Sequence, residues 1–220
     1  MNPFKRSDSK EVRVISPPNY GLLEKDLSDK EMNFLWRCID NRGQSTKGKL
    51  VGQIHESNDL SDMGVWFYIN TLKPLMQIYE ESFIRNPGYK IPTNQFHPYY
   101  LESLWVNFQK QNEFNPIHKH NGVYSFVVWM KIPTKHNEQN KNPIASRAND
   151  EKISVFEFLY SNIFGEHEST AIEMNPDMEG NMLFFPSTFR HGVYPFYNCK
   201  EDRMSISGNL YYDKTTHENT

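Results

Sequence analysis

The hydrophobic and polar positions follow helical spacing in the first half of the chain. Ser28, followed by Glu31, has the pattern of a capping box at the start of a helix. Between about 61 and 85 apolar residues recur near helical spacing, and the sequence NPG at 86–88 is a stop signal, so we expect a longer second helix there. The sequence GQSTKGK at 43–49 predicts a flexible break between the two helices.

From about residue 100 the pattern changes to the alternation typical of strands, and turn-rich stretches separate the apolar segments. The strands that we expect in this half lie at 101–109, 124–132, 153–161, 181–186 and 203–212. VRVI at 12–15 also has the composition of a strand. The charged, Asn-rich stretch 134–150 predicts a surface excursion or, alternatively, a mobile lid over a site.

Helices followed by strands predict an α+β domain in which a sandwich or an open barrel is supported by helices. A chain of 220 residues fits a single domain. We therefore expect one domain over 1–220, with mostly helical support in 1–99 and the β-rich core in 100–213.

Composition narrows the classes of partner. Hydrophobic residues make up 37% of the chain and charged residues 23%, as in soluble globular proteins, and the net charge of −3 provides no basic field for nucleic acid or for anionic membranes. No apolar run approaches the length of a membrane span. The two cysteines, Cys38 and Cys199, make no disulfide framework. We expect a protein of the reducing cytoplasm that binds neither nucleic acid nor membrane.

Three histidines lie where they can converge. His118 and His120 are one residue apart, and in an extended strand such a spacing places both side chains on the same face. The apolar stretch NMLFFP at 181–186 is followed by His191, just past the end of an expected buried strand. Each histidine alone can be an ordinary solvated loop residue, but together they can provide three imidazole ligands for one metal ion.

An arginine begins a polar stripe near the end of the chain. Arg203, Ser205, Ser207 and Asn209 occupy one face of the expected last strand, and Met204 lies on the other face. An arginine in a strand can simply reach solvent. A guanidinium with a hydroxyl two residues further on can also hold a carboxylate through paired, charge-assisted hydrogen bonds.

The order of these motifs carries more information than any one of them. NPIHKHNG, SFVVW, GNMLFFPSTFRHGVYPF and RMSISGN follow one another along the chain. This order resembles the 2-oxoglutarate- and iron(II)-dependent oxygenases, in which His-x-Asp/Glu and a distant His bind iron and a later Arg binds the co-substrate. The resemblance covers 101–212 and is closest to a poorly characterised subgroup frequent in phages of aquatic bacteria.

The resemblance implies a double-stranded β-helix, or jelly-roll, as the metal-binding core. It implies Fe(II) on His118, His120 and His191, with 2-oxoglutarate and O2 as co-substrates. Arg203 and Ser205 would hold the distal carboxylate of 2-oxoglutarate. Asn107 and Trp105 alternate along the preceding strand; Asn107 is a further candidate for a co-substrate contact, whereas we expect Trp105 in the core. The implied activity is hydroxylation of an unknown substrate, in the host cytoplasm if the protein is phage-encoded.

One position departs from the family pattern, because His120 stands where the second ligand is usually a carboxylate. Three neutral imidazoles also occur in cupin-like dioxygenases that use no 2-oxoglutarate, so a cupin-like dioxygenase or isomerase is one alternative. A jelly-roll with a structural or binding role and incidental histidines is another. Arg203 and Ser205 favour the 2-oxoglutarate enzyme, since a cupin-like dioxygenase has no need of a carboxylate clamp.

Overall fold

The computed structural model describes residues 21–84, 98–150 and 152–213, so the strand expected at 12–15 lies outside the described residues. The strands are β1 (Leu23–Asp26), β2 (Glu56–Asp59), β3 (Tyr99–Gln109), β4 (Asn115–His118), β5 (Tyr124–Lys131), β6 (Val155–Ser161), β7 (His167–Glu173), β8 (Asn181–Pro186), β9 (Arg190–Val193) and β10 (Arg203–Tyr212). The α-helices are α1 (Asp29–Asp40), α2 (Lys73–Tyr79) and α3 (His136–Gln139). Shorter 3-10 and π segments are η1 (Lys47–Lys49), η2 (Met63–Val65), η3 (Tyr68–Leu72), η4 (Glu80–Ile84) and η5 (Pro176–Met178).

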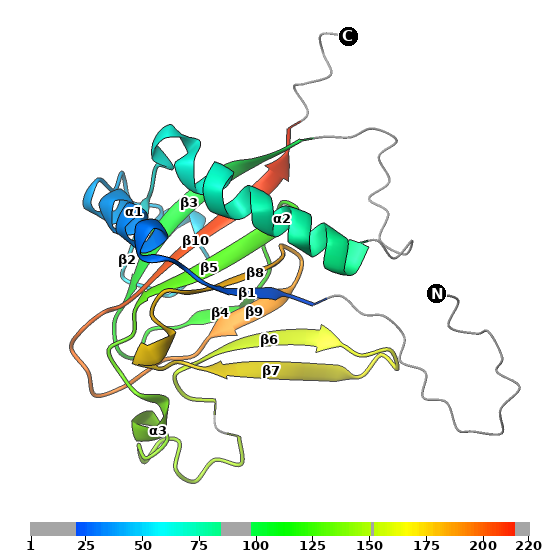
Figure 1. Cartoon of the computed structure of the whole chain (residues 1–220). Helices are drawn as coiled ribbons and strands as arrows, with labels where there is room; N and C mark the ends of the chain where they lie inside the picture. The colour runs from blue at the N-terminus through cyan, green and yellow to red at the C-terminus, as the bar shows by residue number, and fades with distance from the viewer. Residues whose placement is uncertain (1–20, 85–97, 151, 214–220) are drawn as a thin grey trace, which may run out of the picture.

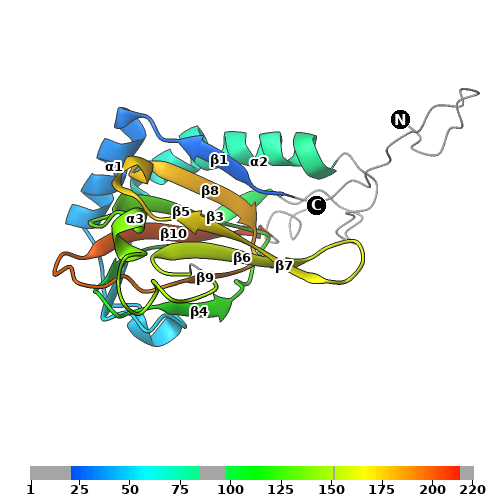
Figure 2. The same ribbon diagram turned by 90° about the horizontal axis from the view of Figure 1, so that it is seen from below.

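The strands form two antiparallel sheets that face each other (Figures 1 and 2). One sheet has the order β1-β8-β5-β10-β3-β2 and the other has the order β4-β9-β6-β7. Helices α1 and α2 cover the outer face of the six-stranded sheet. The arrangement is a double-stranded β-helix supported by amino-terminal helices, which confirms the expected fold class.

The two sides of the six-stranded sheet are buried in separate hydrophobic cores. Residues of α1, α2 and the sheet make the first core, which includes Phe34, Tyr79 and Phe126. Trp129 and Phe185 belong to the second core, which lies between the two sheets. Because β5 is buried on both faces, its sequence is a continuous apolar run rather than an alternation.

All five expected strands are present, but five shorter strands were not expected. These are β1, β2, β4, β7 and β9, of which only β7 exceeds four residues. Their sequences carry many polar residues, and each strand is held by hydrogen bonding to a longer or more buried neighbour: β1 to β8, β2 to β3, β7 to β6. The amino-terminal part of the chain therefore contributes edge strands as well as helices.

The capping box at Ser28 and Glu31 is present in α1. The second expected helix is present as a continuous helical segment over 63–84, but it is not regular α-helix throughout, because it consists of η2, a short α-helical turn at 66–67, η3, α2 and η4. Gly64 adopts a φ of 68°, and Pro74 lacks the N–H that would bond the carbonyl four residues earlier, so regular α-helix is interrupted at both places. No helix of the described ranges is long and apolar enough to cross a membrane.

Candidate active site

Two of the three histidines are directly paired across a sheet. His118 ends β4 and lies opposite His191 of β9 in the strand register. The Nδ1 of His118 lies 2.7 Å from the carbonyl oxygen of Pro116, and the Nδ1 of His191 lies 2.9 Å from that of Phe189. If each Nδ1 carries the proton and donates to its carbonyl, both Nε2 atoms remain free to bind a metal.

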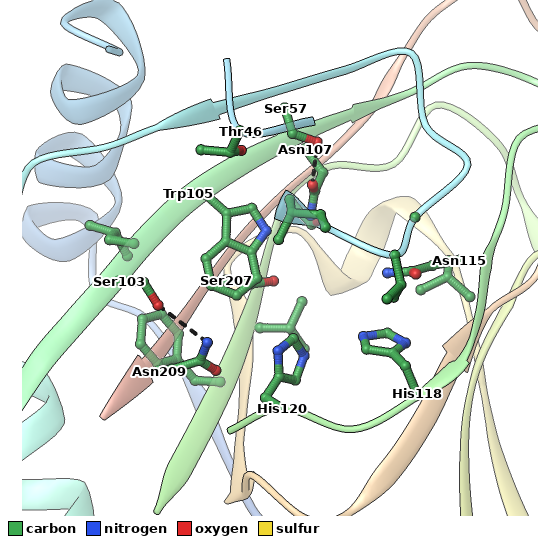
Figure 3. Close-up of a pocket in the computed structure, with 18 of the residues that line it drawn as sticks. Thr46, Ser57, Ser103, Trp105, Asn107, Asn115, His118, His120, Ser207 and Asn209 are labelled. Atoms are coloured by element: carbon green, nitrogen blue, oxygen red, sulfur yellow. Dashed lines mark hydrogen bonds between the residues drawn. The ribbon is translucent and has the colours of Figure 1, made fainter. Parts of the chain in front are cut away.

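The third histidine follows the end of β4. The backbone N–H of His120 donates to the carbonyl of Ser187 at 2.9 Å, which holds the turn between β4 and β5 against the end of β8. Trp105 of β3 lies beside it, with 5.7 Å between the two ring centroids. Figure 3 shows His118 and His120 pointing into one cavity, with Trp105 and Ser207 across from them.

The three imidazoles can hold one metal ion. One ligand nitrogen from each of His118, His120 and His191 lies within 4.8 Å of the others. The Nε2 atoms of His120 and His191 are 3.2 Å apart. Two nitrogens bound at about 2.1 Å and at right angles lie about 3 Å from each other, so this separation fits two adjacent ligands of one ion. The structure brings together the three histidines that the sequence singled out.

Burial keeps these imidazoles in the neutral form that ligation requires. Burial, with smaller contributions from the other two histidines, lowers the pKa of His191 to about 3. Burial and then neighbouring His118 lower the pKa of His120 to about 4, and burial lowers the pKa of His118. Phe156 stacks on the ring of His191 with 5.3 Å between centroids and contributes to its burial. At neutral pH each imidazole is therefore uncharged and can donate a lone pair.

Arg203 is a buried cation at the start of β10. Its side chain donates from Nη1 to Gln109 and to the carbonyl of Tyr194, and from Nη2 to the hydroxyl of Ser154 at 2.6 Å. Burial lowers the pKa of Arg203 to about 9. Its Nε has no hydrogen-bond partner, and no carboxylate of the described residues forms an ion pair with the guanidinium. A buried guanidinium with a free N–H can therefore bind an anionic ligand.

The polar stripe on β10 faces one cavity with the histidines, as its alternation predicted. Arg203, Ser205, Ser207 and Asn209 line this cavity of about 720 Å³, and the three histidines line it as well. Met204 and Ile206 are directed to the first hydrophobic core on the other side of the sheet. An Arg-x-Ser-x-Ser-x-Asn pattern thus delivers four polar side chains to the cavity that holds the imidazole triad.

Asn107 and Trp105 reach the same cavity from β3. The Oδ1 of Asn107 accepts a hydrogen bond of 2.7 Å from Ser57 (Figure 3), which leaves the amide NH2 as a donor. Trp105 is only 5% exposed, as expected for a core residue, yet it is also part of the cavity wall.

Several lining residues were not anticipated from the sequence. Thr46, Leu50 and Ile54 come from the segment expected to be a flexible break and from the residues after it, and they form one wall of the cavity. Ser154 and Gln109, which contact Arg203, carried no motif either. None of the residues 134–150 lines the cavity, so the stretch does not cover the site in this structure.

Fold and site together define a jelly-roll whose cavity holds three histidines that can bind one metal ion. Residues 103–209, which include the three histidines and Arg203, match the family model described as "Putative 2OG-Fe(II) oxygenase". Over these residues the chain is similar to the 2-oxoglutarate- and Fe(II)-dependent oxygenases, as its ordered motifs indicated. The predicted cofactors, Fe(II) and 2-oxoglutarate, are those of this family.

Solved structures share the fold at low sequence identity. HygX from Streptomyces hygroscopicus, solved with nickel, 2-oxoglutarate and hygromycin B, is 9% identical with a TM-score of 0.51, over 87% of this chain and 83% of that chain. The carbocyclase SnoK from nogalamycin biosynthesis is 8% identical with a TM-score of 0.52, over 88% and 80%. A prolyl-4-hydroxylase from Pseudomonas putida is 11% identical with a TM-score of 0.50, over 88% and 94%. No curated protein matches the sequence.

Proposed function

We propose that this oxygenase hydroxylates its substrate at an Fe(II) site made by His118, His120 and His191, with 2-oxoglutarate held by Arg203 and Ser205. One observation carries the proposal: the histidine triad and Arg203, a buried cation with no carboxylate partner among the described residues, line the same cavity. A ligand that chelates a metal at one end and carries a carboxylate at the other fits this pair of features. 2-Oxoglutarate is such a ligand.

The donor set fits Fe(II), since imidazole is one of the ligands that iron accepts, although zinc, nickel and copper also suit it. When bound, Fe(II) with 2-oxoglutarate would activate O2, the oxidant; one oxygen atom would go to succinate, with release of CO2, and the other to the substrate. The backbone carbonyls of Pro116 and Phe189 hold the rings of His118 and His191 in the required orientation. The surrounding aromatic side chains keep water away from His191, which is 4% exposed.

The co-substrate end of the cavity is formed by β3 and β10. Arg203 provides the positive charge, and the hydroxyl of Ser205, two residues further along β10, faces the same cavity. Asn107 lies opposite Ser205 in the register of the two strands. Its amide NH2 is a third donor that 2-oxoglutarate, which has only acceptors, can use.

His120 replaces the carboxylate that usually completes the iron site. A third neutral imidazole leaves the bound ion with one more positive charge, so anionic 2-oxoglutarate is attracted at least as strongly. The same replacement keeps a cupin-like dioxygenase or isomerase, with three histidines and no 2-oxoglutarate, as the second candidate. Arg203, which has no carboxylate partner among the described residues, favours the 2-oxoglutarate enzyme, because an enzyme that binds no carboxylate ligand does not need a buried cation in its cavity.

An anaerobic titration with Fe(II), with and without 2-oxoglutarate, tests the proposal. We expect a visible charge-transfer band that requires both, and succinate formation once O2 is admitted. Iron binding without any effect of 2-oxoglutarate would select the cupin-like candidate. Failure to bind any metal would select a non-catalytic jelly-roll.

Three further parts of the proposal concern the domain organisation, the cellular location and the substrate class of the enzyme. We propose that 1–220 is one domain, in which 1–99 supports the jelly-roll of 100–213. The resemblance to the phage subgroup supports a phage origin, and action in the host cytoplasm follows from it. The primary substrate is a small molecule or a peptide.

A further inference from the structure

Ser154 has an unusual backbone conformation immediately before β6. Its φ is +49°, in the left-handed region that is unfavourable for residues other than Gly, Asn and Asp. The residue is completely buried, and its backbone is fixed on both sides: its N–H donates to the carbonyl of Pro195 and its carbonyl accepts from the N–H of Met174. Strained residues of this kind persist where the surrounding structure requires them, often at functional sites.

The side chain of Ser154 makes the shortest hydrogen bond to Arg203. Its Oγ accepts from Nη2 at 2.6 Å, whereas Gln109 and the carbonyl of Tyr194 accept from Nη1 at 3.5 Å and 3.4 Å. The ring of Phe196 lies against the guanidinium, with 4.8 Å between the guanidinium carbon and the ring centroid. All these partners are neutral, so they fix the guanidinium plane without neutralising its charge.

The contacts leave one edge of the guanidinium for a ligand. Both hydrogens of Nη1 can be used by Gln109 and Tyr194, and one hydrogen of Nη2 is used by Ser154. When Ser154 accepts the Nη2 hydrogen that points toward Nη1, the other Nη2 hydrogen lies beside the Nε hydrogen, which has no partner, and this pair can bind the two oxygens of one carboxylate. A rotation of the guanidinium would remove this paired geometry.

We propose that Ser154 is a positioning residue for Arg203. Its strained backbone places an uncharged acceptor, Oγ, on Nη2. This contact holds the guanidinium so that its Nε–Nη2 edge faces the distal carboxylate of 2-oxoglutarate. The inference depends on the proposed function, because it concerns the same carboxylate. It adds a residue that carries no motif and makes no contact with the metal ligands in the interactions described above.

The test compares Ser154→Ala with Ser154→Gly in the full chain loaded anaerobically with Fe(II). Both variants lose Oγ, but only glycine relieves the strain of a positive φ, so Ser154→Gly should unfold at a higher temperature than Ser154→Ala. Loss of a hydrogen bond that orients a charged group should lower 2-oxoglutarate affinity by about tenfold or more, and equally in both variants. If Ser154→Ala does not fold, Ser154→Gly alone carries the affinity measurement.

A keto acid without the second carboxylate separates positioning from general damage. 2-Oxobutanoate can chelate the metal but offers nothing to Arg203, so its affinity should be the same in both variants and in the parent. Thr71→Val is the matched control. Thr71 is also fully buried, and its hydroxyl donates to the carboxylate of Glu31 in α1. Thr71→Val should lower the unfolding temperature and leave 2-oxoglutarate affinity unchanged.

Three outcomes would overturn the inference: parental 2-oxoglutarate affinity in Ser154→Gly, a loss that follows thermal stability from one variant to the next, or an equal loss for 2-oxobutanoate. A parent protein that binds Fe(II) but not 2-oxoglutarate would instead refute the proposed function. The two failures are therefore distinguishable in one series of titrations.

Discussion

Replacement of Arg203 by Met decides whether the buried guanidinium is a co-substrate clamp. Met keeps much of the aliphatic volume of a side chain that is 2% exposed, and it removes a cation that has no carboxylate partner among the described residues. A ligand carboxylate that loses such a buried, hydrogen-bonded partner typically loses about 3–5 kcal/mol. At about 1.4 kcal/mol for each factor of ten, the affinity for 2-oxoglutarate should fall by roughly a hundredfold or more.

The assay is the anaerobic titration of the Fe(II)-loaded variant with 2-oxoglutarate, followed through the visible band. Metal stoichiometry should stay at the parental value, because Arg203 contacts none of the three histidines in the hydrogen bonds of the structure. Arg203→Lys should be intermediate, since the ammonium keeps the charge and loses the paired donors. A titration curve for Arg203→Met that superimposes on that of the parent would refute the clamp.

Three other predictions concern the histidines. His118→Ala and His191→Ala should each abolish tight Fe(II) or Ni(II) binding in equilibrium dialysis while the far-UV circular dichroism is kept; unchanged stoichiometry in both would exclude the site. His120→Asp should retain metal and some succinate formation, whereas His120→Ala should lose more; parental behaviour of His120→Ala would leave a two-histidine site. Burial lowers the pKa of His120 to about 4 and that of His191 to about 3, whereas both imidazoles have a pKa of about 6.5 in the unfolded chain. The unfolded chain therefore takes up more protons than the folded protein as the pH falls from about 6.5 towards 4. The metal-free protein should be most stable above about pH 6.5 and lose stability progressively over this range. Urea midpoints that do not fall on acidification would contradict this linkage.

The sequence by itself was sufficient to predict the core of the β-helix and the three candidate metal ligands. Period-two alternation and β-branched or aromatic composition are local properties, so the long strands such as β3, β5 and β10 could be read directly. The spacing of His118 and His120 and the alternation that begins at Arg203 are also local, and they state which side chains share a face. The order of the motifs indicated the family and supported His191 as the third candidate ligand.

Only the tertiary structure decided which other residues meet these side chains. The short strands β2 and β4 form because neighbouring strands offer them hydrogen bonds, and their own sequences do not require it. The 46–54 wall reaches the cavity, and Ser154 reaches Arg203, through contacts between residues far apart in the chain, and a positive φ on a serine has no sequence signature. Arg203 could equally have faced solvent from sequence alone; its burial, and the free Nε that results, depend on packing against β3 and the residues before β6. The periodicity of a helix or strand depends on residues that are consecutive in the sequence. The burial of a side chain and the partners of its polar atoms depend on the complete fold.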